Sequence, residues 1–467
     1  MEAFNSSKFF PVVMKFFTVI KNIWSIKELR ERILFTLALL MVYRIGTFVV
    51  LPGVVPAALE NASKNRGAND LLGLINIFTG GAFDKAAIFA LGVMPYITAS
   101  IVVQLLGFAV PYFQRLQTKE GESGRKRLNQ ITRLLTVALT LVQGGGFLQL
   151  IRSIPGAVSS NIPDSVFWFS NIIILTAGTV FCMWLGERIT DKGIGNGVSL
   201  IIMSGIIARL PGAFAFEFQT LFGDNKLLLF FVELAVLFII VLATILVIQG
   251  VRRIPIQFAK RMVGRTGGAL PTASARDYLP LKVNSAGVMP IIFAQALMFL
   301  PATAIQYFSG TDASGGRIHA FNDIYSFGYN ITFFLLIVIF TYVYTALMIN
   351  PTNYAEYLKR SNAFIPGVKP GEATSEYIDN IMTRITLPGA FFLGLIGILP
   401  SIAATFGVNQ EFALFFGGTT LLIMVGVALD TLQVIESYLL TQKYDGLIKS
   451  GRIQGRSAQG LQVGQPQ

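Results

Sequence analysis

Long apolar runs alternate with polar segments along nearly the whole chain. A helix needs roughly 20 apolar residues to cross a bilayer core about 30 Å thick, so each run predicts a membrane-spanning helix. The pattern therefore predicts an all-α polytopic membrane protein with ten spans. They are expected at residues 33–51, 86–108, 134–151, 166–185, 193–210, 227–249, 285–308, 331–349, 386–406 and 413–429.

One stretch departs from this regular pattern. Leu71–Phe78 is apolar but too short to cross a bilayer, and Gly80-Gly81 separates it from the longer apolar run that starts at Ala86. Half-length segments are tolerated at membrane depth only where protein buries them or where they line a cavity. We therefore expect this stretch to lie along the pathway that the protein controls.

The polar segments are larger than simple connections. Residues 1–32 interleave lysines with aromatic and aliphatic side chains, which predicts an amphipathic helix on the membrane surface, with a disordered basic tail as the alternative. Long polar loops are expected at 250–283 and 350–385, and a polar tail at 441–467.

Composition and charge support a membrane topology. Of the 467 residues, 53% are hydrophobic and 13% are charged, whereas about a quarter of a soluble domain is charged. With the N-terminus inside, 29 of the 37 Lys and Arg residues lie in inner segments, 7 in outer segments, and Arg44 lies within a span. This bias follows the positive-inside rule and predicts that both termini are cytoplasmic.

The residues that carry most enzyme chemistry are scarce. The single cysteine, Cys182, excludes an internal disulfide framework and a thiolate metal cluster, and the single histidine, His319, falls in a polar loop. The sequence contains no GxxxxGK[ST] motif for its own ATPase. We therefore expect no catalytic residue, no metal and no cofactor, and energy must come from a partner or an ion gradient.

Two acidic residues fall within predicted spans. Glu233 lies near the outer end of its span and Asp430 near the inner end of another. Charge within a membrane is by default a sign of function. Here the positions near span ends favour side chains that simply reach the interface.

Two pairs of aliphatic residues recur at helical spacing. Val93 and Ile97 are four residues apart, as are Val198 and Ile202, so each pair shares one helix face. Pro95 lies between the first two and is expected to kink its helix. Such pairs serve either ordinary packing or a hydrophobic constriction shared by several helices.

The loop after the sixth span is strongly basic. It begins VRRIPIQFAKRMVGR, with no acidic residue before Asp277. Such a cluster serves either attraction to anionic lipid headgroups or docking of a large anionic partner such as RNA. Composition alone leaves both explanations open.

Several long motifs occur in one order between about residues 24 and 440: NIFTGGAF, IFALGVMPYITASIVVQLL, KEGESGRKR, WLGERITDKGIGNGVSLII, RRIPIQFAKR, YLPLKVNSAGVMPIIFA, AFIPGVKPGE, IDNIMTRITLPGA and FGGTTLLIMV. Their sequence and order resemble the SecY family. Its members are the central channel subunits of the bacterial protein-translocation complex, related to the corresponding channels of archaea and the endoplasmic reticulum.

The resemblance implies ten transmembrane helices in two pseudo-symmetric, inverted five-helix halves. The halves would cover 33–211, with a short plug helix at 71–80, and 227–440, and a hinge at 212–226 would join them. Gly80-Gly81 would be the point about which the plug moves.

The resemblance also implies the site residues. The plug would comprise Leu71, Leu72, Leu74, Ile75, Asn76, Ile77 and Phe78. The pore ring would comprise Val93, Ile97, Val198, Ile202, Ile292 and Ile423. A lateral gate, between the second and third spans on one side and the seventh and eighth on the other, would include Thr98, Gln104 and Leu300.

A docking surface for the ribosome or the SecA motor would include Arg252, Arg253, Lys260, Arg261 and Lys369. Lys369 stands where many bacterial members carry Arg. Lysine keeps the positive charge of that position but loses the bidentate geometry of a guanidinium.

The implied function is that of a passive, non-enzymatic channel subunit in the bacterial plasma membrane. It would translocate unfolded preproteins and release membrane proteins laterally. Its partners would be SecE-type and SecG-type small membrane subunits, the SecA motor ATPase, the ribosome, signal sequences, nascent chains and membrane lipid. An ion-coupled solute carrier is the alternative, because carriers share inverted repeats and broken helices. The aliphatic character of all six ring positions favours the channel.

Overall fold

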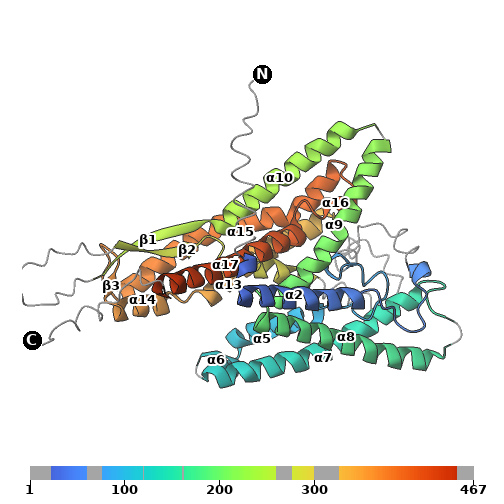
Figure 1. Ribbon diagram of the computed structural model, residues 1–467, viewed down its shortest axis with the longest axis horizontal. Helices are drawn as coiled ribbons and strands as arrows, with labels where there is room; N and C mark the ends of the chain where they lie inside the picture. Colours follow the sequence, from blue (N-terminus) through green and yellow to red (C-terminus); the bar gives the residue numbers. More distant parts are fainter. Residues whose placement is uncertain are drawn as a thin grey trace, which may run out of the picture. The chain divides into compact units, whose positions relative to one another are not determined.

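The computed structural model describes residues 23–59, 76–118, 120–159, 162–223, 225–258, 276–298 and 325–449 (Figure 1). Its long helices are α2 (Lys27–Gly46), α5 (Met94–Ala109), α7 (Gly121–Ser153), α8 (Asp164–Lys192), α9 (Gly197–Gly223), α10 (Leu227–Gln249), α13 (Phe327–Met348), α15 (Glu372–Thr405) and α17 (Gly418–Lys449). Shorter helices are α6 (Pro111–Thr118), α14 (Pro351–Arg360), α16 (Gln410–Ala413) and the helix Met289–Met298. The strands are β1 (Val251–Phe258), β2 (Arg276–Lys282) and β3 (Ala363–Phe364).

Seven helical segments in the described part of the chain are long and apolar enough to cross a membrane. They are Gly121–Ser153, Asp164–Lys192, Gly197–Gly223, Leu227–Gln249, Phe327–Arg360, Glu372–Thr405 and Gly418–Leu440. The other three predicted spans also contain helix, in α2, α5 and Met289–Met298. The prediction of an all-α polytopic membrane protein is confirmed.

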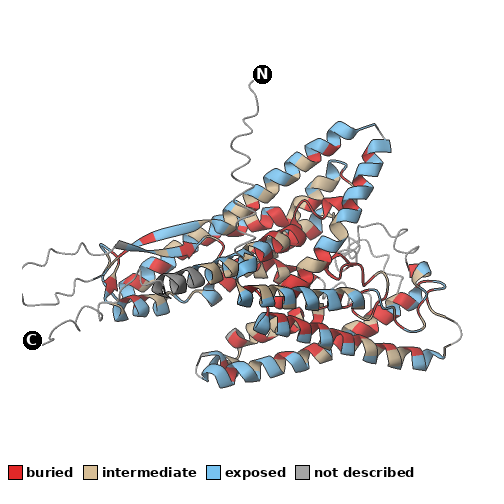
Figure 2. Cartoon of the chain, in the orientation of Figure 1, coloured by how far each residue is buried: buried red, intermediate tan, exposed pale blue. Residues whose placement is uncertain are grey.

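Helix α10 shows most directly how this chain meets lipid. It carries a nearly uninterrupted apolar sequence, and much of its surface is exposed in Figure 2. Leu228 is 80% exposed and Leu246 is 73% exposed. A helix that is apolar all round and yet exposed is unstable in water, so this surface fits a hydrocarbon environment.

The second predicted span begins later than its hydropathy indicates. Residues 86–93 form turns, and the backbone of Ala86 and Ile88 pairs with Leu51 and Val49 instead of continuing a helix. Helix α5 begins only at Met94, so the predicted kink at Pro95 was wrong. Pro95 stands in the first turn, where its missing N–H costs no helical hydrogen bond, and it therefore starts the helix.

The predicted stop at Pro211 was also wrong, because α9 continues to Gly223 through most of the expected hinge at 212–226. A proline inside a helix costs about 3 kcal/mol. Aromatic packing against α10 offsets part of that cost, at about 0.5–1.5 kcal/mol per pair. The ring of Phe230 lies 5.2 Å from that of Phe214 and 5.4 Å from that of Phe218. The non-helical connection is therefore confined to the few residues before Leu227.

The predicted polar loops are largely structured. In the loop 250–283, β1 pairs antiparallel with β2, and β3 from the loop 350–385 adds to the other edge of β1. Helix α14 and the first turns of α15 make up most of the second segment, which is therefore folded. One cluster joins these elements, with Ile254, Ile256, Leu281, Leu358 and Ile378 buried together.

Glu233 does not reach the interface as predicted. Its side chain is buried, within electrostatic range of the buried Glu217 of α9. The backbone N–H of Asn409 lies 3.5 Å from Glu217 Oε1. The position near the end of a span was misleading because α9 extends further than expected and covers this side of α10. Asp430 is exposed.

The chain forms two compact units. One comprises residues 1–45, 183–201 and 427–467, and in its described part Thr36 of α2 accepts a hydrogen bond from the Ile194 N–H at 3.2 Å. The other comprises residues 46–182 and 202–426. Its core includes a cluster of Leu51, Phe83, Leu148, Ile151 and Phe167, which packs the turns before α5 against α7 and α8.

Candidate functional site

Four isoleucines from four helices line one small cavity in the second unit. They are Ile97 of α5, Ile202 of α9, Ile292 of the helix Met289–Met298 and Ile423 of α17. The cavity has a volume of about 10 Å³, which leaves room for no more than about one water molecule. Aliphatic side chains around so small a cavity exclude water and the ions that travel with it.

Local sequence places each of these side chains. Pro95 starts α5, so Ile97 lies in its first turn, where its N–H bonds to the Val93 carbonyl at 3.0 Å. Gly417 and Gly418 precede Ile423 and allow the start of α17 to approach α15 closely. A Cβ at Gly417 would lie 2.7 Å from the carbonyl oxygen of Ile396. The ring position on α17 therefore depends on the absence of a side chain at Gly417, six residues before Ile423.

Phe78 closes one side of the same cavity. It ends a short helical segment that is described from Asn76, and Asn76, Ile77 and Phe78 are all buried. Leu71, Leu72, Leu74 and Ile75 lie outside the described residues. The chain then turns at Gly80 and Gly81, whose φ angles of 64° and 92° favour glycine.

The two valines predicted for the ring do not line this cavity. Val93 is buried at the start of α5, and Met94 faces the cavity instead. Val198 belongs to the other compact unit, where a Cβ at Gly186 would lie 2.8 Å from its Cγ2 atom. The structure thus brings together four of the six predicted ring residues.

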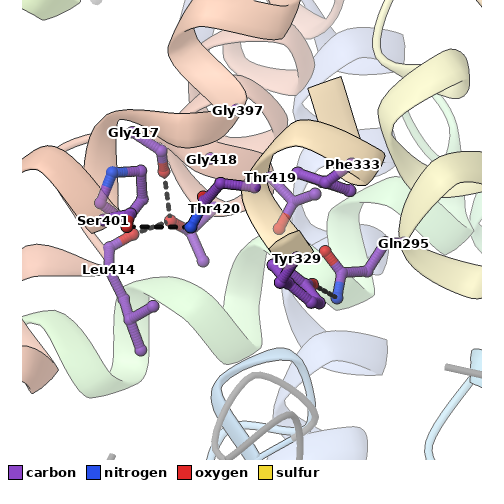
Figure 3. Close-up of a pocket in the computed structure, with 12 residues that line it drawn as sticks. Gln295, Tyr329, Phe333, Gly397, Ser401, Leu414, Gly417, Gly418, Thr419 and Thr420 are labelled. Carbon is purple, nitrogen blue, oxygen red and sulfur yellow. Dashed lines mark hydrogen bonds between the residues drawn. The ribbon is translucent and has the colours of Figure 1, made fainter. Parts of the chain in front are cut away.

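Two polar residues that sequence reasoning missed complete the cavity wall. Gln295 and Thr419 line the isoleucine cavity and also a second cavity of about 20 Å³, which Figure 3 shows. Gln295 Nε2 donates to the Tyr329 hydroxyl at 3.4 Å, and Asn330 Nδ2 donates to Ser401 Oγ at 2.9 Å. Polar residues within otherwise apolar runs were the available signal.

The predicted gate residues are only partly described. Thr98 is buried on α5, and its hydroxyl donates to the Met94 carbonyl at 3.1 Å. Gln104 lies further along α5 and donates to Ser100 Oγ at 3.2 Å. Leu300 lies outside the described residues. The two described members therefore bond within their own helix.

Two of the five basic residues predicted for docking lie on the small sheet. Arg252 and Arg253 of β1 are exposed, opposite Leu281 and Pro280 of β2, whereas Ile254 and Ile256 point into the core. Lys369 is exposed before α15. Lys260 and Arg261 fall outside the described residues. The sheet fixes the two arginines on a folded surface rather than on a loose loop.

No three His, Cys, Asp or Glu side chains gather within the described ranges in a way that could hold a metal ion. The buried Cys182 is a free thiol.

Comparisons with known proteins agree with these features. The sequence profile of the SecY family matches residues 87–432. The chain is 43% identical to the protein translocase subunit SecY of Streptomyces galbus over 439 residues, which cover 90% of this chain and 97% of the relative.

Two solved structures share the fold. One is a SecY protein whose plug domain is described as stabilising the closed state of the translocation channel and maintaining a membrane seal. It matches with a TM-score of 0.60 and 19% identity, over 87% of this chain and 92% of the other. The second is Sec61 in the canine ribosome–channel complex, with a TM-score of 0.58, 17% identity and the same coverage.

Proposed function

The chain belongs to the SecY family and is the protein-conducting channel subunit of a translocase, and from this premise we propose how its residues perform that task. The protein is not an enzyme. It is a passive pore, sealed by an aliphatic ring and a plug and driven by partners. Unfolded preproteins cross through the ring, and membrane proteins leave sideways into lipid.

The cavity shared by Ile97, Ile202, Ile292 and Ile423 carries this proposal. A polypeptide of any sequence must pass without sticking, so the wall should offer few hydrogen bonds. Aliphatic side chains meet that requirement, deform around a chain, and exclude ions by dewetting when they close. Val93 and Val198 are proposed to complete the ring when the channel is assembled in a membrane.

We assign the stopper to residues 71–80, because Phe78 at its described end seals the isoleucine cavity. Gly80 and Gly81 supply the turn about which it moves. The pseudo-symmetric halves 33–211 and 227–440, joined through the α9–α10 connection, would separate at a gate formed by Thr98, Gln104 and Leu300. Gln104 weakens apolar closure there, so a hydrophobic signal sequence can compete for the seam.

The exposed arginines of β1 support docking of partners on the cytoplasmic side. The charge bias of the loops supports a cytoplasmic position for this sheet and for both termini, with the channel in the inner membrane of a bacterium. The ribosome is one proposed partner, since the canine Sec61 relative is found in a ribosome complex. The SecA motor would use the same surface, and small SecE-type and SecG-type subunits would accompany the channel.

The ion-coupled carrier was the alternative that the sequence left open. A carrier holds its solute and coupling ion with charged or polar ligands near the membrane midplane. Gln295 and Thr419 are the polar residues at the isoleucine cavity, and neither is charged. The aliphatic wall therefore favours the channel.

Reconstitution tests the proposal. The chain, co-purified with its small subunits, is placed in liposomes with a motor ATPase and a preprotein, and import is read as protease protection. A variant lacking 71–78 should import the preprotein but leak ions at rest. If the full chain imports the preprotein and the deletion variant does not leak, the plug assignment is wrong but the channel function stands. Absence of import, with uptake of a small solute along an ion gradient, would favour the carrier.

A further inference from the structure

Beyond the ring and plug, we propose that Asp84 and Arg209 form a latch that holds the plug on α9 and sets how stringently the channel selects signal sequences. The inference rests on the proposed function. The chain segment between Phe78 and Asp84 connects the plug to α5, so whatever anchors this segment decides where Phe78 stands relative to the ring.

Hydrogen bonds join Asn76, at the end of the plug, to Asp84, in the segment that connects the plug to α5. The Asn76 side-chain amide donates to the Asp84 carboxylate, and the Asp84 N–H donates to Asn76 Oδ1 at 3.2 Å. The Gly81 N–H also bonds to the Asn76 carbonyl at 2.8 Å. These bonds tie the end of the plug helix to its connection, so Asp84 and the plug move together.

Arg209 attaches this segment to α9. Its Nη2 atom donates to Asp84 Oδ2 at 3.0 Å, and the two side chains are 30% and 25% exposed. Gly81 lies beside the same guanidinium, where a Cβ would stand 3.4 Å from Arg209 Nε. A charge-assisted bond at this partial burial is stronger than a surface ion pair because water screens it less.

One face of α9 joins the latch to the ring. Ile202, Gly205 and Arg209 are three and four residues apart, so they lie in a row along one side of the helix. Ile202 lines the cavity, Gly205 contacts the plug backbone, and Arg209 bonds to Asp84. Ring, plug and latch therefore share one rigid element, and Phe78 leaves the ring only when the Arg209 bond to Asp84 is lost.

This arrangement makes the pair specificity-determining. A signal sequence must supply enough binding free energy to release the plug, and the latch adds its own strength to that requirement. A weak signal fails where a strong one succeeds because the latch remains closed. Loss of either charge should shift the opening equilibrium by about fivefold, the upper range for one partly exposed pair.

The test uses Asp84→Asn, Arg209→Gln and the double variant in the full translocase. Each single variant should raise export of a preprotein with a defective signal by about fivefold and increase resting ion conductance. The double variant should match the single ones, because either change alone already breaks the bond. Arg209→Lys keeps the positive charge but loses the planar guanidinium group. Its export of the defective preprotein and its resting conductance should lie between those of the original chain and of Arg209→Gln.

Arg152→Gln is the matched control, since it removes another arginine–carboxylate pair, to Asp164 at 2.5 Å, that includes neither Asp84 nor Arg209. It should leave stringency and conductance unchanged. Additive effects of the two latch substitutions would overturn the proposal, as would lower thermal stability with unchanged stringency. If the variant lacking 71–78 conducts ions at rest while both latch variants do not, the latch proposal is wrong and the plug assignment is supported. If the variant lacking 71–78 also shows no resting ion conductance, the plug assignment itself is wrong.

Discussion

Gly205 of α9 lies directly against the carbonyl oxygen of Phe78. A Cβ at position 205 would stand 2.4 Å from that oxygen and 3.1 Å from the backbone nitrogen of Gly80. Real Cβ atoms do not approach backbone this closely, so a side chain here must displace the plug or the helix. The absence of a side chain on α9 is thus a condition for the closed state.

Gly205→Ala should therefore open the resting channel. The methyl group pushes the backbone at Phe78 away from α9, and the aromatic ring withdraws from the isoleucine cavity. We expect higher ion conductance in planar bilayers and export of signal-defective preproteins. Gly212→Ala is the control, since a Cβ there meets nothing within 4 Å. Equal conductance of the two variants would contradict the close contact.

Replacing Ile97 or Ile423 by Asn should loosen the ring. Both side chains are buried in the cavity wall, and an amide there attracts water into a space that otherwise stays dry. Conductance should rise, and signal stringency should relax. Ile423→Leu conserves volume and should change conductance little. An unaltered seal in the Asn variants would rule out a hydrophobic gasket at these positions.

The helices that were predicted most accurately are those that the membrane alone determines. The predicted sixth span and α10 share the bounds Leu227 and Gln249, because an uninterrupted apolar run ends at Lys226 on one side and Gly250 on the other. Prolines were misread where neighbours decide their effect. Pro95 lies in the first turn of α5, and Pro211 lies inside the continuous helix α9. Both outcomes depend on contacts that are distant in sequence.

The candidate site was less accessible from the sequence. The isoleucines could be paired within a helix by spacing, but closing the ring requires four helices to meet. Asp84 and Arg209 are 125 residues apart, and no periodicity connects them. The alternation of buried Ile254 and Ile256 with exposed neighbours was a readable strand signal in the basic loop. Its partner β2 begins 18 residues after β1 ends, too far for a hairpin turn to reveal.

Reversing Arg252 and Arg253 to Glu should weaken docking of the ribosome or the motor. Both residues are exposed on β1, so the fold should survive their reversal. Binding in a pull-down should fall by an order of magnitude or more, and the loss should shrink as salt is raised. Arg125→Glu with Arg127→Glu reverses two exposed charges on α7 and serves as control. Retained binding would leave attraction to lipid headgroups as the role of the β1 arginines.

Ile254→Ala should disrupt the sheet that carries those arginines. Ile254 is 2% exposed and packs in the cluster with Leu281 and Ile378. Removing such a side chain costs about 2–5 kcal/mol, so local protease cleavage near β1 should accelerate in detergent-solubilised protein. Tyr278→Ala removes an exposed side chain from the paired strand and should have a small effect. Similar cleavage rates would show that the cluster does not support the sheet.

Thr36→Val should destabilise the turn between α8 and α9. The Thr36 hydroxyl donates to the Arg32 carbonyl at 2.9 Å and accepts from the Ile194 N–H at 3.2 Å, in a space where a Cβ at Gly193 would stand 2.4 Å from it. Valine fills nearly the same volume but leaves the buried Ile194 N–H unpaired, at a cost of about 1–3 kcal/mol. The melting temperature in detergent should fall. Thr220→Val removes only an exposed bond to the Phe216 carbonyl and should melt like the original chain. Equal melting of both variants would mean that water replaces the Thr36 hydroxyl at this turn.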